Sequence, residues 1–499
     1  MRRMSEGRSL CGVFLFCAVA AVASRAQVTF TTLASFDGPD GYYPSMALVQ
    51  GSDGNFYGTT YYGGTSCGYR GGNGCGTVFK ITRNGKLTRL YSFCHISQCA
   101  DGDQPEASLV QATNGKFYGT TVSGGSGPDG CGTVFEITEQ GKLTTLHTFD
   151  GNDGCGPLAG LIQAANGNFY GTTYVGGMQG GGTVFEITTT GRFTSLYSFC
   201  SLPNCADGAR PESSLVQGTD GYFYGTTGAG GISYNNAPCS TTGCGTVFRI
   251  TGTGGLTTLY SFCALANCAD GSNPSAALVQ ATNGNFYGVT PDGGTNCVTD
   301  SGCGTVFKVT PQGKLTSLYS FCSLTNCADG RSSLAPLIQA TDENFYGTTF
   351  GGGTGFGTLF EITPAGTLTT LYSMCSTANC SDGDLPSGAL LQATNGIFYG
   401  TTEQGGTNGD GNVFSLSTGL GPFVSFIHNP AKIGQQFGIL GYGLTGTTSV
   451  SFNGVAANFK LQSDTLLVAT VPAGATTGYV TVMTPSGTLT SNVPFHVIR

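Results

Sequence analysis

The sequence predicts an all-β fold built from seven copies of one structural unit. The tripeptide Phe-Tyr-Gly recurs every 52 to 63 residues, beginning at Phe56, Phe117, Phe169, Phe223, Phe286, Phe345 and Phe398. Glycine accounts for 83 of the 499 residues, and short runs rich in Thr, Val, Phe and Tyr lie between glycine-rich turns, which is typical of β-strands. Repetition with a period of this length indicates a propeller, a solenoid or an array.

Each repeat is expected to form four antiparallel strands. In the second repeat these strands are predicted over residues 108–112, 116–122, 132–138 and 142–149. Asn114-Gly115, between the first two strands, is the two-residue signal for a type I′ hairpin. Four short antiparallel strands per repeat is the pattern of one propeller blade.

The two ends of the repeat region complement each other. Residues 30–36 resemble the fourth strand of a repeat, while the seventh repeat has three predicted strands, near 389–393, 397–402 and 412–416. Together with six complete repeats they make 28 strands, which is seven blades of four. We therefore predict a seven-bladed β-propeller over residues 27–418 that is closed by the N-terminal strand, because closure removes exposed sheet edges. An open β-solenoid is the alternative, but it does not explain the complementary ends.

The flanking segments differ from the repeats. Residues 1–26 combine Arg2, Arg3 and Arg8 with an apolar stretch and small residues, so we predict a cleaved signal peptide and a secreted or cell-surface protein. No second apolar segment is long enough to span a membrane, so we expect no membrane insertion. Residues 421–499 contain no cysteine and seven short predicted strands, which indicates a small immunoglobulin-like β-sandwich. We expect the mature protein to be a monomer.

Eighteen cysteines follow the predicted signal peptide, and their spacing predicts local disulfides. Five pairs have the spacing C-x4-C after the fourth strand of a repeat, namely Cys94/Cys99, Cys200/Cys205, Cys263/Cys268, Cys322/Cys327 and Cys375/Cys380. Three pairs lie within one glycine-rich loop each, and two single cysteines remain, which gives Cys67/Cys75, Cys239/Cys244, Cys297/Cys303 and Cys131/Cys155. Thiolate metal sites are the less favoured alternative, because C-x-x-C doublets are absent.

All of these cysteines fall in two sets of loops. One set joins the second and third strands of a repeat, and the other connects one repeat to the next. In a propeller both sets lie on the same side of the molecule, which we call the loop face. Since exposed loops on a rigid scaffold usually carry function, we expect the functional residues on this face.

The repeat unit F-Y-G-T-T-x(n)-G-G-x(n)-G-T-V-F-x-I-T-x-x-G-x-L-T-x-L-Y-S-F resembles the Gloeo/Verruco (choice-of-anchor) tandem repeat of exported bacterial proteins, over about residues 30–418. The C-terminal region resembles an IPT/TIG domain through Gly441-Tyr-Gly-Leu, Val450-Ser-Phe-Asn-Gly and Ala469-Thr-Val-Pro. The first resemblance implies secretion or surface display and no characterised reaction. The second implies an extracellular all-β module that serves as a spacer or a binding surface.

The repeated motif Asp-Gly-x-x-Pro in the connections has two interpretations. A ring of carboxylates could hold Ca²⁺, and the richest pairs for such a site are Asp101 with Asp103 and Asp382 with Asp384. Alternatively, Asp caps a turn, Gly takes a positive φ angle and Pro enters the next strand. Because the motif recurs in nearly every repeat, the turn interpretation is favoured, and no cofactor is otherwise expected.

Evidence for catalysis or for nucleic-acid binding is weak. The four histidines lie outside any Ser or Cys nucleophile motif, and a formal net charge of −8 disfavours nucleic acid as a partner. Glu136 and Glu186 would resemble the carboxylate pair of a glycosidase only at a suitable separation.

The repeats differ most in their loops, and this difference gives the functional hypothesis. The predicted ligand-binding residues are Tyr61, Tyr62, Tyr69, Arg70, Tyr174, Tyr234, Asn235 and Asn236. Exposed Tyr and Asn are suited to recognition, although these rings could instead cover the loop stems. We predict a non-enzymatic exported scaffold that binds an extracellular glycan or protein, the alternative being an extracellular lyase or hydrolase that degrades polysaccharide.

Overall fold

The computed structural model describes residues 27–66, 75–127, 130–232, 239, 243–296 and 303–498. Within these ranges the protein is all-β, apart from five 3₁₀ turns at Ser97–Cys99, Pro203–Cys205, Ala266–Cys268, Thr325–Cys327 and Ala378–Cys380. None of the described helical segments is long and apolar enough to cross a membrane.

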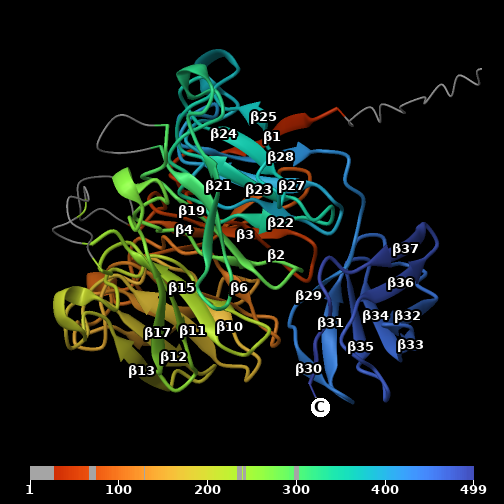
Figure 1. The fold of residues 1–499 in the computed structure, drawn as a ribbon. Helices are drawn as coiled ribbons and strands as arrows, with labels where there is room; N and C mark the ends of the chain where they lie inside the picture. The colour runs from red at the N-terminus through yellow and green to blue at the C-terminus, as the bar shows by residue number, and fades with distance from the viewer. Residues whose placement is uncertain are drawn as a thin grey trace, which may run out of the picture.

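The repeats form four-stranded antiparallel sheets in which the strands follow one another in sequence order (Figure 1). The first three sheets consist of β2 (Val49–Gln50), β3 (Phe56–Thr60), β4 (Thr77–Ile81) and β5 (Leu87–Ser92); β6 (Val110–Gln111), β7 (Phe117–Thr121), β8 (Thr133–Ile137) and β9 (Leu143–Thr148); and β10 (Ile162–Gln163), β11 (Phe169–Thr173), β12 (Thr183–Ile187) and β13 (Phe193–Ser198). The next three consist of β14 (Val216–Gln217), β15 (Phe223–Thr227), β16 (Thr246–Ile250) and β17 (Leu256–Ser261); β18 (Val279–Gln280), β19 (Phe286–Thr290), β20 (Thr305–Val309) and β21 (Leu315–Ser320); and β22 (Ile338–Gln339), β23 (Phe345–Thr349), β24 (Thr358–Ile362) and β25 (Leu368–Ser373).

The seventh sheet combines the two ends of the repeat region. Its order is β1 (Thr29–Ser35), β28 (Asn412–Ser417), β27 (Phe398–Thr402) and β26 (Leu391–Gln392). β1 runs antiparallel to β28, with Phe30 opposite Leu416, and the two strands lie side by side in Figure 1 although they are far apart in the sequence.

The first strand of each repeat is shorter than expected. The second repeat has only Val110–Gln111 in the ladder, whereas we predicted residues 108–112. Only Val110 and Gln111 pair with the next strand, opposite Tyr118 and Phe117, while Ser108 lines a cavity and Leu109 packs in the core between two sheets.

The Phe-Tyr-Gly motif recurs because it joins neighbouring sheets. The Tyr ring of one sheet packs on the Phe ring of the next, with ring centroids 4.0–4.3 Å apart, in the pairs Tyr57–Phe117, Tyr118–Phe169, Tyr170–Phe223, Tyr224–Phe286, Tyr287–Phe345 and Tyr346–Phe398. Tyr399 of the last sheet packs on Phe56 of the first at 4.1 Å. The glycine is required as well, since a Cβ atom at Gly58 would lie 2.6 Å from the ring of Phe79.

A second set of contacts joins the sheets in the same order. The glutamine that ends the first strand of each repeat accepts a hydrogen bond from a backbone N–H in the preceding repeat, as in the pair Ser52 N–H and Gln111 Oε1 at 2.8 Å. The equivalent bonds involve Gln163, Gln217, Gln280, Gln339 and Gln392. Gln50 of the first repeat accepts its bond from Thr394 of the last, at 3.0 Å. The hydrophobic cores between sheets follow the same pattern, because Phe56 and Tyr399 belong to one core cluster.

The C-terminal region forms a separate group of strands, drawn in blue in Figure 1. One sheet contains β29 (Ser425–Phe426), β31 (Gln436–Leu440), β35 (Leu466–Thr470) and β34 (Phe459–Ser463), and the other contains β33 (Val455–Ala456), β32 (Ser449–Phe452), β36 (Val480–Thr484) and β37 (Gly487–Thr490). β30 (Ala431–Lys432) pairs in parallel with β38 (Val497–Ile498). Residues of both sheets, among them Phe437 and Phe452, pack in one core. β30, β33 and β37 were not among the seven strands predicted, because each is only two to four residues long.

Candidate functional site

The connections between sheets share one backbone geometry. In each connection the residue directly before the proline of the Asp-Gly-x-x-Pro motif has a positive φ angle. In the sixth repeat, which lacks a proline at this position, Ser332 takes the equivalent place. The seven residues are Tyr43, Gln104, Gly156, Arg210, Asn273, Ser332 and Leu385. The N–H of this residue donates to a carbonyl in a loop of the preceding sheet, as Gln104 does to Cys75 at 2.9 Å. Tyr43 of the first connection donates to Asp410 of the last repeat at 3.2 Å. The loops therefore hold the next residue of each connection in a fixed position.

The aspartate of the Asp-Gly motif stabilises its own turn. Asp101 is fully buried, and its carboxylate accepts hydrogen bonds from the Tyr91 hydroxyl at 2.8 Å and from the N–H groups of His95 and Ile96. The same tyrosine bond is made to Asp207, Asp270, Asp329 and Asp382. The carboxylates of Asp101 and Asp382 are thus occupied by protein donors.

The two aspartates that follow lie elsewhere in the connections. Asp103 and Asp384 form bridges with the loops at Ser123 and Gln404, respectively. They belong to different repeats, so the four predicted Ca²⁺ candidates are divided between two connections.

Disulfides fasten the loop face. Bonded pairs are Cys94–Cys99, Cys131–Cys155, Cys200–Cys205, Cys239–Cys244, Cys263–Cys268, Cys322–Cys327 and Cys375–Cys380, which are the pairs expected from the sequence. Cys75 and Cys303 are also disulfide-bonded, and their expected partners, Cys67 and Cys297, lie outside the described residues. Disulfides in this number are typical of a protein that folds in an oxidising compartment outside the cytoplasm.

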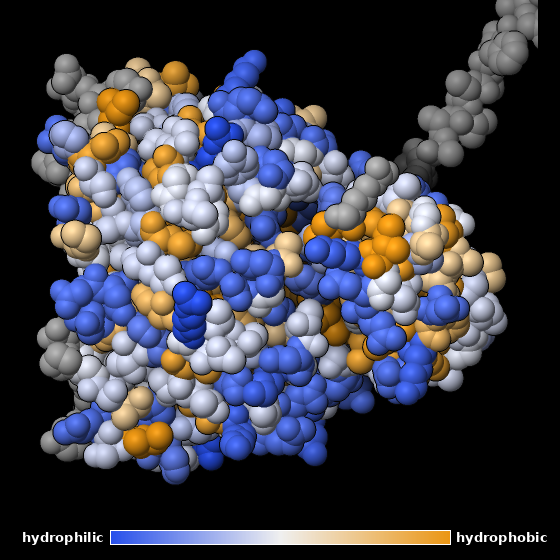
Figure 2. Space-filling model, turned by 90° about the horizontal axis from the view of Figure 1, so that it is seen from below, coloured by the Kyte–Doolittle hydropathy of each residue, from blue (hydrophilic) through white to orange (hydrophobic). Residues whose placement is uncertain are grey.

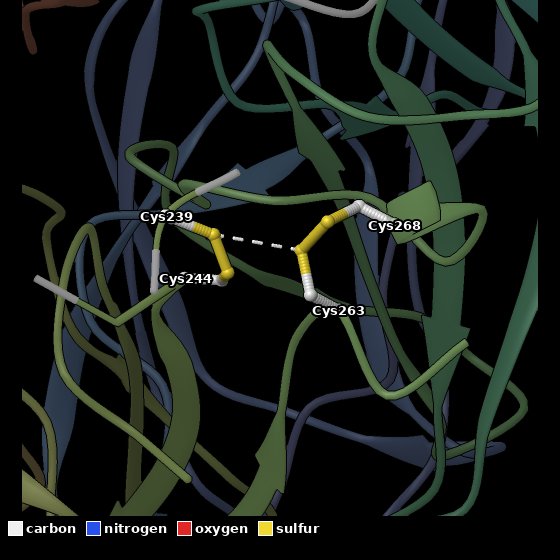
Figure 3. Close-up of side chains that lie close together, drawn as sticks. All are labelled: Cys239, Cys244, Cys263 and Cys268. Carbon is white, nitrogen blue, oxygen red and sulfur yellow. Dashed lines mark hydrogen bonds between the residues drawn. A yellow bond between two sulfur atoms is a disulfide. The ribbon is translucent and has the colours of Figure 1, made fainter. Parts of the chain in front are cut away.

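Some disulfides lie against each other. Figure 3 shows Cys239–Cys244 beside Cys263–Cys268, and the Sγ atoms of Cys239 and Cys263 are 3.5 Å apart. Four thiolates at such distances could hold zinc, but here the sulfurs are bonded in pairs.

Four tyrosines gather on the loop face, and we call them the tyrosine cluster: Tyr42, Tyr43, Tyr61 and Tyr62. Tyr42 stacks on Tyr62 with ring centroids 5.2 Å apart, and Tyr61 meets Tyr62 edge-on at 4.4 Å. All four side chains are partly exposed. The structure thus brings together two of the predicted binding residues, Tyr61 and Tyr62, with Tyr42 and Tyr43.

The other predicted binding residues do not join this cluster. The Tyr174 ring lies 5.7 Å from the guanidinium group of Arg210, at a different connection. Arg210 lines a groove of about 660 Å³ between the loops of the third and fourth sheets. Tyr69, Arg70, Tyr234, Asn235 and Asn236 lie outside the described residues.

All seven repeats line a single cavity of about 250 Å³, which we call the central cavity. The residue after the conserved proline position contributes in each repeat, in the order Ser45, Glu106, Leu158, Glu212, Ser275, Leu334 and Ser387. Glu403, which directly follows β27, also lines it. The described residues that line the cavity include no Lys, Arg or His. Three carboxylates from three sheets therefore share a space without a basic side chain in its wall.

Burial raises the pKa of all three carboxyl groups, and two of them also act on the third. Burial and the negative charges of Glu403 and Glu212 raise the pKa of Glu106 to about 7. Burial also raises the pKa of Glu212, against the opposing effect of Arg210. Burial raises the pKa of Glu403, as does the charge of Asp384, while the hydroxyls of Ser387 and Tyr43 lower it.

The tyrosine cluster borders this cavity. Burial and the negative charge of Glu106 raise the pKa of Tyr61 to about 12. Burial and a hydrogen bond to Glu403 likewise raise the pKa of Tyr43. The cluster and the acidic cavity are thus adjacent parts of one site.

Sequence reasoning missed Glu106, Glu212 and Glu403. The sequence does distinguish Glu106 and Glu212, because at the position after the proline only these two repeats carry an acid and the others carry Ser or Leu. A position-by-position alignment of the seven repeats would have revealed it. Glu136 and Glu186, by contrast, are engaged within their own sheets, by Lys116 at 2.6 Å and by Asn168 at 2.6 Å.

The surface in view in Figure 2 is mixed, with hydrophobic residues in small groups among hydrophilic ones over the larger part of the molecule. Four exposed aliphatic side chains recur by repeat, each directly before a 3₁₀ turn, at Ile96, Leu202, Leu265 and Leu324.

Comparison with solved structures finds distant likenesses. The extracellular domain of a B. thetaiotaomicron protein assigned as a hybrid two-component system is 12% identical, with a TM-score of 0.48, 95% of this chain covered and 58% of that one. Hydrazine synthase of Kuenenia stuttgartiensis is 13% identical, with a TM-score of 0.47, 76% of this chain covered and 97% of that one. A luciferin-regenerating enzyme is 11% identical, with a TM-score of 0.39, 63% of this chain covered and 92% of that one. No curated protein matches the sequence.

The sequence itself identifies the family. The Gloeobacter/Verrucomicrobia repeat matches residues 22–239 and 237–482, which together span most of the chain. These matches agree with the seven Phe-Tyr-Gly units and with the sheets that they form. The chain therefore belongs to the Gloeobacter/Verrucomicrobia repeat family.

Proposed function

We propose that this protein is an exported, non-enzymatic β-propeller that binds a neutral extracellular glycan through its loop face. The observation that carries this proposal is the tyrosine cluster, which presents four partly exposed rings beside the central cavity. Tyrosine rings offer rigid apolar area for the faces of sugar rings, and their hydroxyls bond sugar hydroxyls.

The proposed architecture is a closed ring of seven blades with a C-terminal immunoglobulin-like sandwich of the IPT/TIG type. The Tyr399–Phe56 stack and the Thr394–Gln50 hydrogen bond support closure, since each repeats a contact found between the other neighbouring sheets. The sandwich contacts the repeat region through Thr465, which donates to the Ser52 carbonyl at 2.9 Å, and through Arg83, which lies 4.6 Å from the Tyr442 ring. We assign it the role of a spacer.

The charge of the site favours a neutral ligand. The net charge is −8, and three carboxylates line the cavity next to the tyrosines. A polyanionic ligand would be repelled. Export is supported by the disulfides on the loop face and by the basic and apolar residues of segment 1–26.

The test is a glycan array followed by calorimetry with the mature protein. We expect binding to neutral polysaccharides that falls by about tenfold or more in the double variant Tyr61→Ala/Tyr62→Ala, since aromatic anchors dominate such sites. Tyr479→Ala is the matched control, because Tyr479 is 42% exposed but lies in the C-terminal region. Absence of binding to any glycan, or equal binding by the cluster variant and the wild type, would contradict the proposal.

An enzyme that degrades polysaccharide is the second candidate. The observation in its favour is Glu106, whose pKa of about 7 suits a general acid at neutral pH. Depolymerisation of a polysaccharide by the wild type, lost in Glu106→Gln but not in Glu136→Gln, would replace the binding proposal with this one.

A further inference from the structure

The groove beside Arg210 is built from residues that break the symmetry of the repeats, and we call it the Arg210 groove. It has a volume of about 660 Å³ and lies between loops of the third and fourth sheets, with Gln179, Gly181, Arg210 and Ile232 among its lining residues. Pockets that hold small molecules have volumes of about 300–1,000 Å³, so this groove has room for several side chains of a ligand.

A missing side chain helps to open the groove. Gly181 stands where the other repeats have Cys75, Cys131, Cys244, Cys303, Phe356 and Asp410. Three of those cysteines lie in compact groups with the cysteines of the connection that follows. In the third repeat Cys200 and Cys205 line the groove instead, and a Cβ atom at Gly181 would already lie 2.8 Å from the Sγ atom of Cys200.

Two exposed apolar side chains flank the groove at a position that is polar in the other repeats. The residue after the Gly-Gly pair in the loop between the second and third strands is Met178 in the third repeat and Ile232 in the fourth, whereas the other repeats have Thr65, Ser126, Thr295, Thr354 and Thr407. Met178 is 88% exposed and Ile232 is 59% exposed. Ile232 lines the groove, and Met178 directly precedes Gln179, which also lines it. Single exposed apolar side chains are common, but here the two repeats that border one groove are the two that carry them, which indicates a contact with an apolar partner.

Arg210 is the one charged side chain among the described residues that line the groove. It is exposed, and no described carboxylate forms an ion pair with it. Glu212, on whose carboxyl group its charge acts, lines the central cavity instead. The equivalent residues of the other connections are Tyr43, Gln104, Gly156, Asn273, Ser332 and Leu385, so the cation is specific to this groove as well. An isolated guanidinium group on a protein with a net charge of −8 complements a carboxylate of a ligand, which it can bind through two parallel hydrogen bonds.

The combination of side chains favours a protein ligand over a sugar. Met and Arg are both enriched in protein–protein interfaces, where apolar side chains pack against apolar side chains of the partner. A sugar would present hydroxyl groups to Met178 and Ile232 and would leave their apolar surface without a matching contact.

We propose that the Arg210 groove binds a short extended segment of a partner protein in which a carboxylate side chain is flanked by apolar side chains. The carboxylate pairs with Arg210, and the apolar side chains contact Met178 and Ile232. This goes beyond glycan binding, because no residue of the tyrosine cluster lines the Arg210 groove.

The test starts with a library of random heptapeptides displayed on phage and selected on the immobilised full mature chain. We expect the enriched sequences to share an Asp or Glu flanked by Leu, Ile, Val, Met or Phe. A synthetic peptide of the enriched sequence, labelled with fluorescein, then gives the affinity by fluorescence anisotropy.

Two variants with residues taken from other repeats test the groove itself. Arg210→Gln should weaken binding of this peptide by about tenfold or more, as the loss of a hydrogen-bonded charge pair does. The backbone accepts glutamine here, because Gln104 has the same positive φ angle at the equivalent position. The double variant Met178→Thr/Ile232→Thr should also weaken binding by about tenfold, through lost apolar contact.

Matched controls lie elsewhere on the protein. Arg331→Gln changes an exposed arginine in another connection, and Leu324→Ala removes a side chain that is 55% exposed, so both should bind the peptide like the wild type. Tyr61→Ala/Tyr62→Ala should bind the peptide normally too, even where glycan binding is lost. Failure of the glycan proposal and failure of this one are therefore distinguishable.

A double-mutant cycle tests the charge pair directly. Replacing the acid of the peptide by its amide should cost as much affinity as Arg210→Gln, and the two changes together should cost no more than either alone. No shared sequence among the selected peptides, a shared sequence without an acid, or unchanged affinity in both groove variants would overturn the proposal. So would binding of a uronate-bearing glycan that is lost in Arg210→Gln while no peptide is enriched, because the ligand would then be a carbohydrate.

Discussion

Replacing Glu106 by Gln tests the electrostatics of the central cavity. The pKa of Glu106 is raised from 4.5 to about 7 in the folded chain, mainly by burial and then by Glu403 and Glu212. The folded state therefore retains a proton that the unfolded state has already lost. Between about pH 4.5 and 7 the free energy of unfolding must fall as pH rises, because the unfolded state binds fewer protons there.

The size of this effect follows from the shift. A difference of about 2.5 pKa units corresponds to about 3 kcal/mol above pH 7, which is an upper value for a partly buried group. Glutamine has nearly the same shape but no charge. Glu106→Gln should therefore match the wild type at pH 4 and exceed its free energy of unfolding by up to about 3 kcal/mol at pH 8.

The assay is urea denaturation of both proteins at pH 4, 6 and 8. Equal or lower stability of Glu106→Gln at pH 8 would refute the reasoning, because the cavity would then already contain compensation for its charge.

Four further predictions concern the scaffold. Deleting residues 27–36 leaves the edge of β28 unpaired, so light scattering should detect oligomers that the full mature chain does not form. Phe286→Ala removes the ring that packs 4.0 Å from Tyr224 and should lower the free energy of unfolding by about 3–5 kcal/mol, measured by denaturation; a loss below about 1 kcal/mol would contradict a tightly packed contact. Tyr372→Phe removes the hydroxyl that donates to buried Asp382 and should cost about 2 kcal/mol in the same assay, with the ring contact to Phe30 retained. Replacing Cys131 and Cys155 together by Ser opens a loop of 24 residues and should cost about 3 kcal/mol, against about 2 kcal/mol for Cys200 and Cys205, whose separation is 5; the reverse order in melting experiments would contradict the loop-entropy argument.

The sequence predicted the sheets because their signals are local. The Phe-Tyr-Gly unit requires a glycine against the Phe79 ring and two aromatic residues toward the neighbouring sheets, so it had to recur unchanged in every repeat. Cysteine spacing likewise predicted the bonded pairs, since partners five residues apart lie in one turn. The strands that were missed, such as β33 (Val455–Ala456), are too short to show a periodic pattern.

The site was only partly predictable, because it depends on positions that are brought together by the arrangement of seven sheets. Tyr61 and Tyr62 were predicted because they are aromatic residues in an unusual loop. Their contact with Tyr42 and Tyr43 depends on the backbone bridge between Tyr42 and Tyr62, which joins two different loops. Glu106 and Glu403 are 297 positions apart in the sequence, and nothing in their local surroundings marks them as neighbours. For the Asp-Gly motif the turn interpretation was favoured over Ca²⁺ binding because the motif recurs, and the carboxylate of Asp101 does accept hydrogen bonds from its own turn.

The most direct test is a crystal structure of the protein with a neutral oligosaccharide selected by the glycan array. The account predicts a sugar ring in contact with the rings of Tyr61 and Tyr62, beside the central cavity. An oligosaccharide bound elsewhere on the protein, with the tyrosine cluster unoccupied, would contradict the account.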